Sequence, residues 1–254
     1  MGKFPDLYPY SAAEASRFKE LDQWRQSRMV NIRCKEAIEK AISRDFDGMY
    51  LKDGCVQSVI AEFGYKRVNF VLANTLKEKE YDGRFSTTNR AWFGKTFVPP
   101  DKDHNSSFVV DSHPAVLDGF MTEFRRLYQE LGLFGTEQCE SKDEAAFEGK
   151  VLAVSPSALD EEYLTVQDQL WYASGGFGCN PHGSGRAVFA TCLATGESAR
   201  WNRTDFIGPV KEELLPDWAK AQAEKLRAGE KLSPIEIPTS APAEGPAPGM
   251  NQTM

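Results

Sequence analysis

Residues 186–201 decide the fold class of the C-terminal half, and they read Arg-Ala-Val-Phe-Ala-Thr-Cys-Leu-Ala-Thr-Gly-Glu-Ser-Ala-Arg-Trp. The runs Arg186–Leu193 and Ser198–Trp201 contain the β-branched and aromatic residues that are typical of strands. Between them, Ala194-Thr195-Gly196-Glu197 supplies a turn. The stretch therefore predicts a β-hairpin.

Two more strand-like runs precede this hairpin, at Lys150–Val154 and Gln169–Ala173. After Leu215-Pro216-Asp217, the residues Trp218, Ala219, Gln222 and Leu226 share one helical face. We therefore expect a small α+β module over residues 149–229. The Pro-, Ala- and Gly-rich residues 230–254 have too little apolar surface to fold, so we predict a disordered tail.

The N-terminal half has helical periodicity instead. Ser11-Ala12-Ala13-Glu14 is a capping box that starts a helix, and apolar residues recur at helical spacing as far as Asp47-Gly48. The sequence leaves open whether 11–46 is one helix or two helices broken near Ser27.

Further helices are predicted around 56–63, closed by Gly64, around 68–76, after Ser86, and from Pro114, with Asp111 or Ser112 as its cap. We expect an α-helical domain over residues 1–135, an acidic linker over 136–148, and an α+β fold for the chain as a whole.

Charge and hydropathy exclude several classes of protein. The chain of 254 residues has a net charge of -7 and a hydrophobic fraction of 41%, which excludes a protein that coats polyanions with its whole surface. Residues 1–100 carry 17 Lys and Arg against 13 Asp and Glu, whereas residues 101–148 carry 4 against 11 and residues 149–254 carry 9 against 13. No run has the length of a membrane span or signal peptide, and the five cysteines are odd in number, so we expect a cytoplasmic protein with no membrane partner.

The segment 175–186 is the most unusual in the chain because it contains five glycines. Glycine-rich loops bind anions through exposed backbone N–H groups, so Gly176, Gly178, Gly185, His182 and Arg186 are candidates for ligand binding. The segment lacks the phosphate-loop and dinucleotide patterns, and a strand follows it instead of a helix. A shaped connection between two strands also explains the glycines and is the interpretation we favour.

Trp171, Trp201 and Arg200 are further candidates, because aromatic rings interleaved with guanidinium groups stack on nucleic acid bases. The competing interpretation places both tryptophans in the core of the module. Cys179 and His182 have the spacing of metal ligands, but no second ligand pair accompanies them, so we expect no metal and no other cofactor.

Helices before and after Gly64 resemble a helix-turn-helix, in which Lys66, Arg67 and Asn69 would face a DNA groove. Helical hairpins are common in any α domain, and the local charge is only mildly positive. DNA binding through these residues therefore stays a third hypothesis.

Six blocks of sequence resemble an uncharacterised family of bacterial proteins carried on conjugative elements, domain-of-unknown-function family 3849. They are Leu7-Tyr8-Pro9-Tyr10-Ser11, Asp45-Phe46-Asp47-Gly48-Met49, Glu62-Phe63-Gly64-Tyr65-Lys66-Arg67, Val110-Asp111-Ser112-His113-Pro114, Gly175-Gly176-Phe177-Gly178-Cys179 and Ser184-Gly185-Arg186-Ala187-Val188-Phe189. The resemblance covers most of residues 7–228. It implies an accessory protein of a mobile element and supplies no catalytic residue.

The leading hypothesis is a non-enzymatic interaction protein that binds a host protein, an element-encoded protein or a nucleic acid, in counter-defence or in transfer. The alternative is an enzyme that binds a nucleotide or another small ligand at residues 175–186. No catalytic constellation is complete in the sequence, and the oligomeric state stays open.

Overall fold

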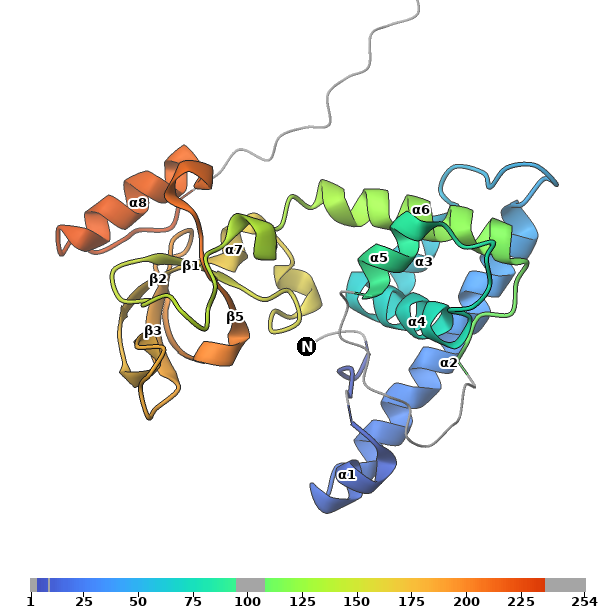
Figure 1. The fold of residues 1–254 in the computed structure, drawn as a ribbon, viewed down its shortest axis with the longest axis horizontal. Helices are drawn as coiled ribbons and strands as arrows, with labels where there is room; N and C mark the ends of the chain where they lie inside the picture. The colour runs from blue at the N-terminus through green and yellow to red at the C-terminus, as the bar shows by residue number, and fades with distance from the viewer. Residues whose placement is uncertain (1–3, 9, 95–107, 236–254) are drawn as a thin grey trace, which may run out of the picture.

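The computed structural model describes residues 4–8, 10–94 and 108–235. An α-helical part is followed by a smaller part built on a five-stranded antiparallel sheet (Figure 1). The α+β fold is therefore confirmed. Residues 236–254 of the predicted disordered tail lie outside the described residues. No described helix combines the length and the apolar character needed to cross a membrane.

The helices of the N-terminal part follow the predicted pattern closely. Ser11 and Glu14 form the predicted capping box, with the Ser11 hydroxyl accepting from the Glu14 backbone N–H. Residues 11–46 form two helices that are broken at Lys19, where φ is 63°, and Ser27 lies within the second helix. The helices are α1 (Ala12–Arg17), α2 (Leu21–Asp45), α3 (Cys55–Phe63), α4 (Tyr65–Glu78), α5 (Thr87–Gly94) and α6 (Pro114–Glu130).

Helix α6 corrects one prediction about capping. Its N-cap is His113, and neither Asp111 nor Ser112 caps the helix with a side chain. Pro114 occupies the first turn as predicted, since it has no N–H group to leave without an acceptor. A buried cluster joins α2, α3, α4 and α6, and it includes Ile38, Leu72 and Phe120.

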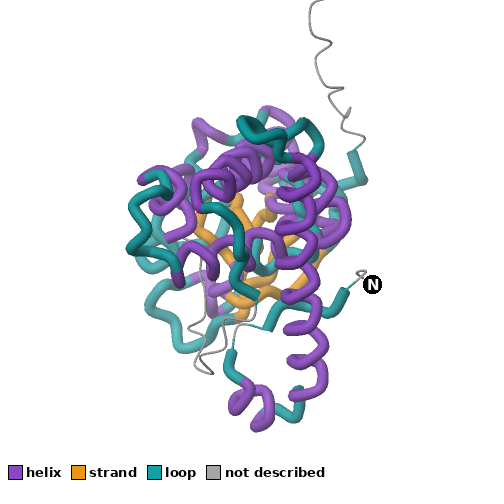
Figure 2. Tube along the Cα trace, turned by 90° about the vertical axis from the view of Figure 1, so that its right-hand side faces the viewer, coloured by secondary structure: helices purple, strands orange, loops and turns teal. Residues whose placement is uncertain are grey.

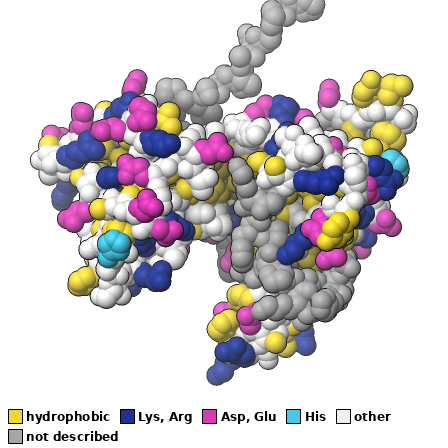
Figure 3. Space-filling model, viewed as in Figure 1, with side chains coloured by type: hydrophobic (Ala, Val, Ile, Leu, Met, Phe, Trp, Pro, Cys, Tyr) yellow, Lys and Arg dark blue, Asp and Glu magenta, His cyan; other side chains and the backbone are white. Residues whose placement is uncertain are grey.

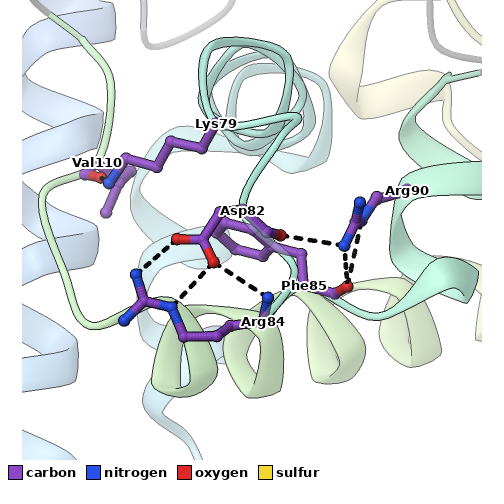
Figure 4. A network of polar contacts seen from close by, with 6 residues as sticks. All are labelled: Lys79, Asp82, Arg84, Phe85, Arg90 and Val110. Atoms are coloured by element: carbon purple, nitrogen blue, oxygen red, sulfur yellow. Dashed lines mark hydrogen bonds and ion pairs between the residues drawn. The ribbon is translucent and has the colours of Figure 1, made fainter.

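The connection between α4 and α5 is held by a network of polar contacts (Figure 4). Arg90 donates to the carbonyl oxygens of Phe85 at 2.8 Å and Asp82 at 3.0 Å, and Arg84 pairs with the Asp82 carboxylate. Lys79 donates to the Val110 carbonyl at 2.7 Å. These contacts fix the α4–α5 turn and attach the segment before α6 to α4.

The sheet has the strand order β4-β3-β2-β1-β5, so β1 lies between β2 and β5. The predicted hairpin is confirmed, with Phe189 opposite Arg200 and Val188 opposite Trp201. The strands are β1 (Val151–Val154), β2 (Leu170–Gly175), β3 (Ala187–Cys192), β4 (Ser198–Asn202) and β5 (Phe206–Pro209), accompanied by α7 (Val166–Gln169) and α8 (Asp217–Arg227). In Figure 2 the strands are seen behind the helices of the N-terminal part.

Different parts of the chain pack on the two faces of the sheet. One face carries Leu152, Trp171 and Phe206, which pack with Phe147 and with the loop that follows β1. On the other face, Val151, Ala153 and Leu170 pack with residues of α8. The cover over this second face includes Ala219 and Ala223, which are buried.

Residues 136–148, for which we expected an acidic linker, lie against the sheet. Cys139 forms a bridge with Val210, the Glu140 N–H donates to Pro209 at 2.7 Å, and Phe147 is fully buried. A carboxylate from the C-terminal part also contacts the helical part, since Glu161 accepts from the backbone N–H groups of Tyr65 and Lys66 at the start of α4. The two parts of the chain are thus in direct contact.

Candidate functional site

A cavity of about 940 Å³ lies between the α2–α3 loop and the first turns of α6; we call it the α2–α3 cavity. Apolar side chains from both elements contribute to its lining, and the rim carries charged groups. The lining residues are Phe46, Met49, Tyr50, Leu51, Lys52, Asp53, Gly54, Cys55, Val56, Gln57, His113, Ala115, Val116, Gly119, Glu123 and Arg126.

The α2–α3 loop presents two large apolar side chains to solvent. Met49 is 73% exposed and Tyr50 is 69% exposed. In Figure 3 hydrophobic side chains gather at the top right, where Figure 1 places this loop. Single exposed apolar side chains are common, but neighbouring ones that form a patch beside a cavity are typical of interaction sites.

Local hydrogen bonds hold these side chains outward. The Asp47 carboxylate accepts from the backbone N–H groups of Met49 at 2.8 Å and Tyr50 at 2.7 Å, which keeps the pKa of Asp47 below its ordinary value. Phe46 and Leu51 form a bridge across the base of the loop. The exposed pair therefore belongs to an ordered turn.

Some of the charged groups at the rim are paired. Arg126 pairs with Glu123 at 2.7 Å and also with Glu130, and it lowers the pKa of Glu123. Burial, followed by the nearby Asp45 carboxylate, raises the pKa of the Cys55 thiol to about 11. A thiol with that pKa is protonated at neutral pH and is a poor nucleophile. The site is suited to binding an apolar group between paired charges.

The glycine-rich candidates lie in a loop that packs against itself. A Cβ at Gly176 would collide with the Ala187 carbonyl, and one at Gly178 would collide with the Arg186 carbonyl. A Cβ at Gly185 would come within 2.7 Å of the Phe177 Cβ. Close approach of the backbone to its own chain accounts for these glycines without a ligand.

The buried side chain of Arg203 organises the same loop. Its guanidinium donates to the carbonyl oxygens of Gly178 at 2.6 Å, Ala145 at 2.7 Å and Lys142, and it lies 3.8 Å from the centre of the Phe147 ring. His182 and Arg186 are exposed on the loop.

The two candidate tryptophans lie inside the sheet core. Their rings meet edge to face with centres 5.1 Å apart, and the Trp171 Nε1 donates to the Asp168 carbonyl at 2.7 Å. Arg200 is exposed on the opposite face of β4 from Trp201. The structure therefore does not bring Arg200 and the tryptophans together.

Two of the three residues singled out for DNA binding, Arg67 and Lys66, have partners within the protein. Arg67 is buried and donates to the carbonyl oxygens of Pro5 and Ser27 and to Asn31, and burial lowers its pKa to about 10. Lys66 donates to the carbonyl oxygens of Leu159 at 2.6 Å and Ser157 at 3.2 Å. Asn69 is partly buried in the same helix.

Four of the sequence blocks converge in pairs. Asp45–Met49 and Val110–Pro114 contribute Phe46, Met49 and His113 to the α2–α3 cavity. Residues from the blocks 7–11 and 62–67 line a second cavity of about 710 Å³, together with Asp160, Glu161 and Glu162. Pro9 of the first block lies outside the described residues.

Residues 7–129 match the sequence model of a family described as "protein of unknown function (DUF3849)". The match covers the helical part and ends before the sheet, so the blocks at 175–179 and 184–189 fall outside it. None of the curated proteins and none of the solved structures compared with the chain matches it. Within the described residues, no three His, Cys, Asp or Glu side chains gather to hold a metal ion, and all five cysteines are free and buried.

Sequence reasoning did not single out Met49, Tyr50 or the cavity beside them. The sequence contained one indication of this site: Met49 and Tyr50 are large apolar residues in the turn that directly follows Asp47-Gly48, where the helix was predicted to end. Large apolar residues in a turn are either folded back into the core or presented to a partner, and only the structure distinguishes the two.

Proposed function

We propose that the protein is a non-enzymatic interaction protein that binds a partner protein at the α2–α3 cavity. The observation that carries this proposal is the exposure of Met49 and Tyr50 on an ordered turn beside a cavity of about 940 Å³. An aromatic or apolar anchor next to a pocket is the usual centre of a protein interface. The partner would place an apolar side chain in the cavity and cover Met49 and Tyr50.

The chemistry of the cavity favours binding over catalysis. Its thiol is held protonated, and the rim carboxylate of Glu123 is engaged by Arg126. His113 also lines the cavity, and catalysis there would need a nucleophile or base together with a second group that activates it.

The biological setting extends the same proposal. The resemblance to proteins of conjugative elements suggests an accessory protein that acts in the bacterial cytoplasm, on a host protein or on one encoded by the element. Counter-defence and assistance in transfer are the two roles that such a partner would serve.

A photo-crosslinking experiment tests the proposal. The crosslinking residue p-benzoylphenylalanine replaces Tyr50 in one variant and Tyr81, which is 91% exposed elsewhere in the helical part, in a matched control. In nuclease-treated bacterial lysate, we expect a defined protein to crosslink at position 50 but not at position 81. For the purified partner, Tyr50→Ala should weaken binding by about thirtyfold, the typical effect of truncating an aromatic anchor.

Two controls decide the outcome. Met49→Asp in the Tyr50 crosslinking variant should abolish the crosslink, because a charge beside the cavity opposes apolar contact. The proposal is wrong if the same proteins crosslink at positions 50 and 81, or if none crosslinks at position 50.

A further inference from the structure

The hairpin of β3 and β4 has one open face, which we call the outer face. The side chains that alternate onto it are Ala187, Phe189 and Thr191 from β3, and Ser198, Arg200 and Asn202 from β4. On β1 and β2 the same side of the sheet is packed with α8 residues, whereas Phe189 is 51% exposed. Figure 1 shows β3 at the side of the sheet that points away from the helical part.

Phe189 is surrounded by groups that leave its ring accessible. Arg200 lies directly opposite on β4, where facing side chains are about 5 Å apart at Cβ. Gly175 faces Phe189 from β2, and the Cβ that Gly176 lacks would lie 3.3 Å from the Phe189 ring. The backbone of β2 thus ends beside the ring without a side chain to cover it.

A second exposed ring lies next to Gly176. Phe177 follows it directly and is 77% exposed, with Gly185 packed against its Cβ. The loop that contains five glycines therefore presents a second aromatic ring to solvent, one residue beyond the glycine that lies against Phe189. Two exposed phenylalanines on one module offer apolar surface to a ligand.

The charge of the outer face is positive and unpaired. None of its six side chains is acidic. Among the described residues, Arg200 forms no ion pair and donates no side-chain hydrogen bond. In a chain with a net charge of -7, this arginine is available to an anionic partner.

We propose that the outer face of β3 and β4 binds single-stranded nucleic acid. Unpaired bases would stack on Phe189 and Phe177, while Arg200 would contact phosphates. Rings that stand out from a sheet stack on bases only where those bases are unpaired, so duplex DNA is excluded. Thr191, Ser198 and Asn202 offer uncharged hydrogen-bonding groups beside the rings.

This surface is separate from the α2–α3 cavity and does not depend on the partner protein proposed there. β4 is an edge strand, so the nucleic acid backbone would have free access along one side of the outer face. With one or two phosphates contacted, the affinity should fall about three- to sevenfold between 50 and 200 mM salt.

Fluorescence anisotropy with a labelled oligothymidylate of about 12 nucleotides, a length within the usual site size, tests the proposal. We expect binding by the full chain at 50 mM salt and weaker binding to a duplex of the same length. Phe189→Ala and Phe177→Ala should each weaken binding at least about fivefold, because each removes a stacking platform. Arg200→Gln should weaken binding and flatten its salt dependence.

Phe18→Ala is the matched control, because Phe18 is 59% exposed at the C-cap of α1 and far along the chain from the sheet. It should leave binding unchanged, and far-UV circular dichroism should show that all the variants are folded. The proposal is overturned if the oligothymidylate does not bind at 50 mM salt, or if Phe189→Ala and Phe177→Ala bind as well as the parent chain. Equal competition by heparin, which lacks bases, combined with unchanged binding by the phenylalanine variants would show a simple polyanion effect and would also overturn it.

Discussion

The helical part and the sheet part both contain a buried arginine. One guanidinium group joins helices, and the other joins loops. Arg67 joins the segment at Pro5 to α2 and α4, so it fixes the packing of helices. Arg203 joins Gly178 to residues 142 and 145, so it fixes loops around the sheet. Both are bound mainly by carbonyl oxygens, which shows that a buried cation can serve as a multiple hydrogen-bond donor without a carboxylate partner.

The two parts also differ in the surface that each leaves open. The helical part has a cavity beside an exposed apolar turn, whereas the sheet part has a flat face with aromatic and cationic groups. Under our two proposals these surfaces bind different ligands, a protein side chain in one case and stacked bases in the other. Perturbing one part at a time should therefore separate the two activities.

The largest expected effect comes from removing the buried arginines. Arg67→Ala and Arg203→Ala should each lower the free energy of unfolding by about 3 kcal/mol or more, because several buried carbonyl oxygens lose their donor. Lysine should not rescue either variant, since it lacks the planar fork of donors. Urea unfolding followed by circular dichroism measures the effect, and the exposed Arg25→Ala is the control. A loss of less than about 1 kcal/mol at both sites would contradict this role.

Much of the fold of both parts could be predicted from the sequence, because the features concerned depend on short-range sequence patterns. The Ser11–Glu14 capping box, the Gly64 corner and the hairpin around Gly196 depend on a few neighbouring residues, so each was predicted correctly. The break at Lys19 was not, because a lysine with φ of 63° carries no local signal. The structural role of Arg67 as a buried hydrogen-bond donor could not be predicted either, since its acceptors at Pro5 and Ser27 are distant in sequence.

A loss of folding stability of intermediate size is expected at alkaline pH. Burial raises the pKa of Cys34 to about 12 and of Cys139 to about 11, from an ordinary value of 9.0. The folded state therefore keeps thiol protons that the unfolded state loses, so this stability is complete below pH 9.0 and declines as the pH rises toward 11 and 12. For Cys34 alone the loss between pH 8 and pH 10 is about 1 kcal/mol.

Urea unfolding at a series of pH values checks this expectation. Cys34→Ala and Cys55→Ala should flatten the pH dependence of the helical part, and Cys139→Ala should flatten that of the sheet part. The informative quantity is the slope of the free energy of unfolding against pH, because the alanine substitutions also change packing and so shift the free energy at every pH. Identical slopes in all the variants and the parent would refute the assignment to these thiols.

The smallest expected effect concerns the contact between the two parts. Glu161→Gln removes the negative charge that faces the start of α4 but keeps an oxygen acceptor for the Tyr65 and Lys66 N–H groups. The free energy of unfolding should fall by about 0.3–1 kcal/mol at low salt and by less at high salt. The neighbouring Glu162→Gln is the control, and an equal effect of both variants would show that the position of the charge is unimportant.

The pairing of β1 with β5 has a consequence for synthesis of the chain. β1 is the first strand in sequence, yet one of its two neighbours is the last, with Leu152 opposite Pro209. On the ribosome the sheet cannot be completed until β5 emerges, by which time all of α1 to α6 has been made and can fold through contacts closer in sequence. The helical part can therefore form before the sheet is complete, and the contact between Glu161 and the start of α4 joins the two parts once both have folded.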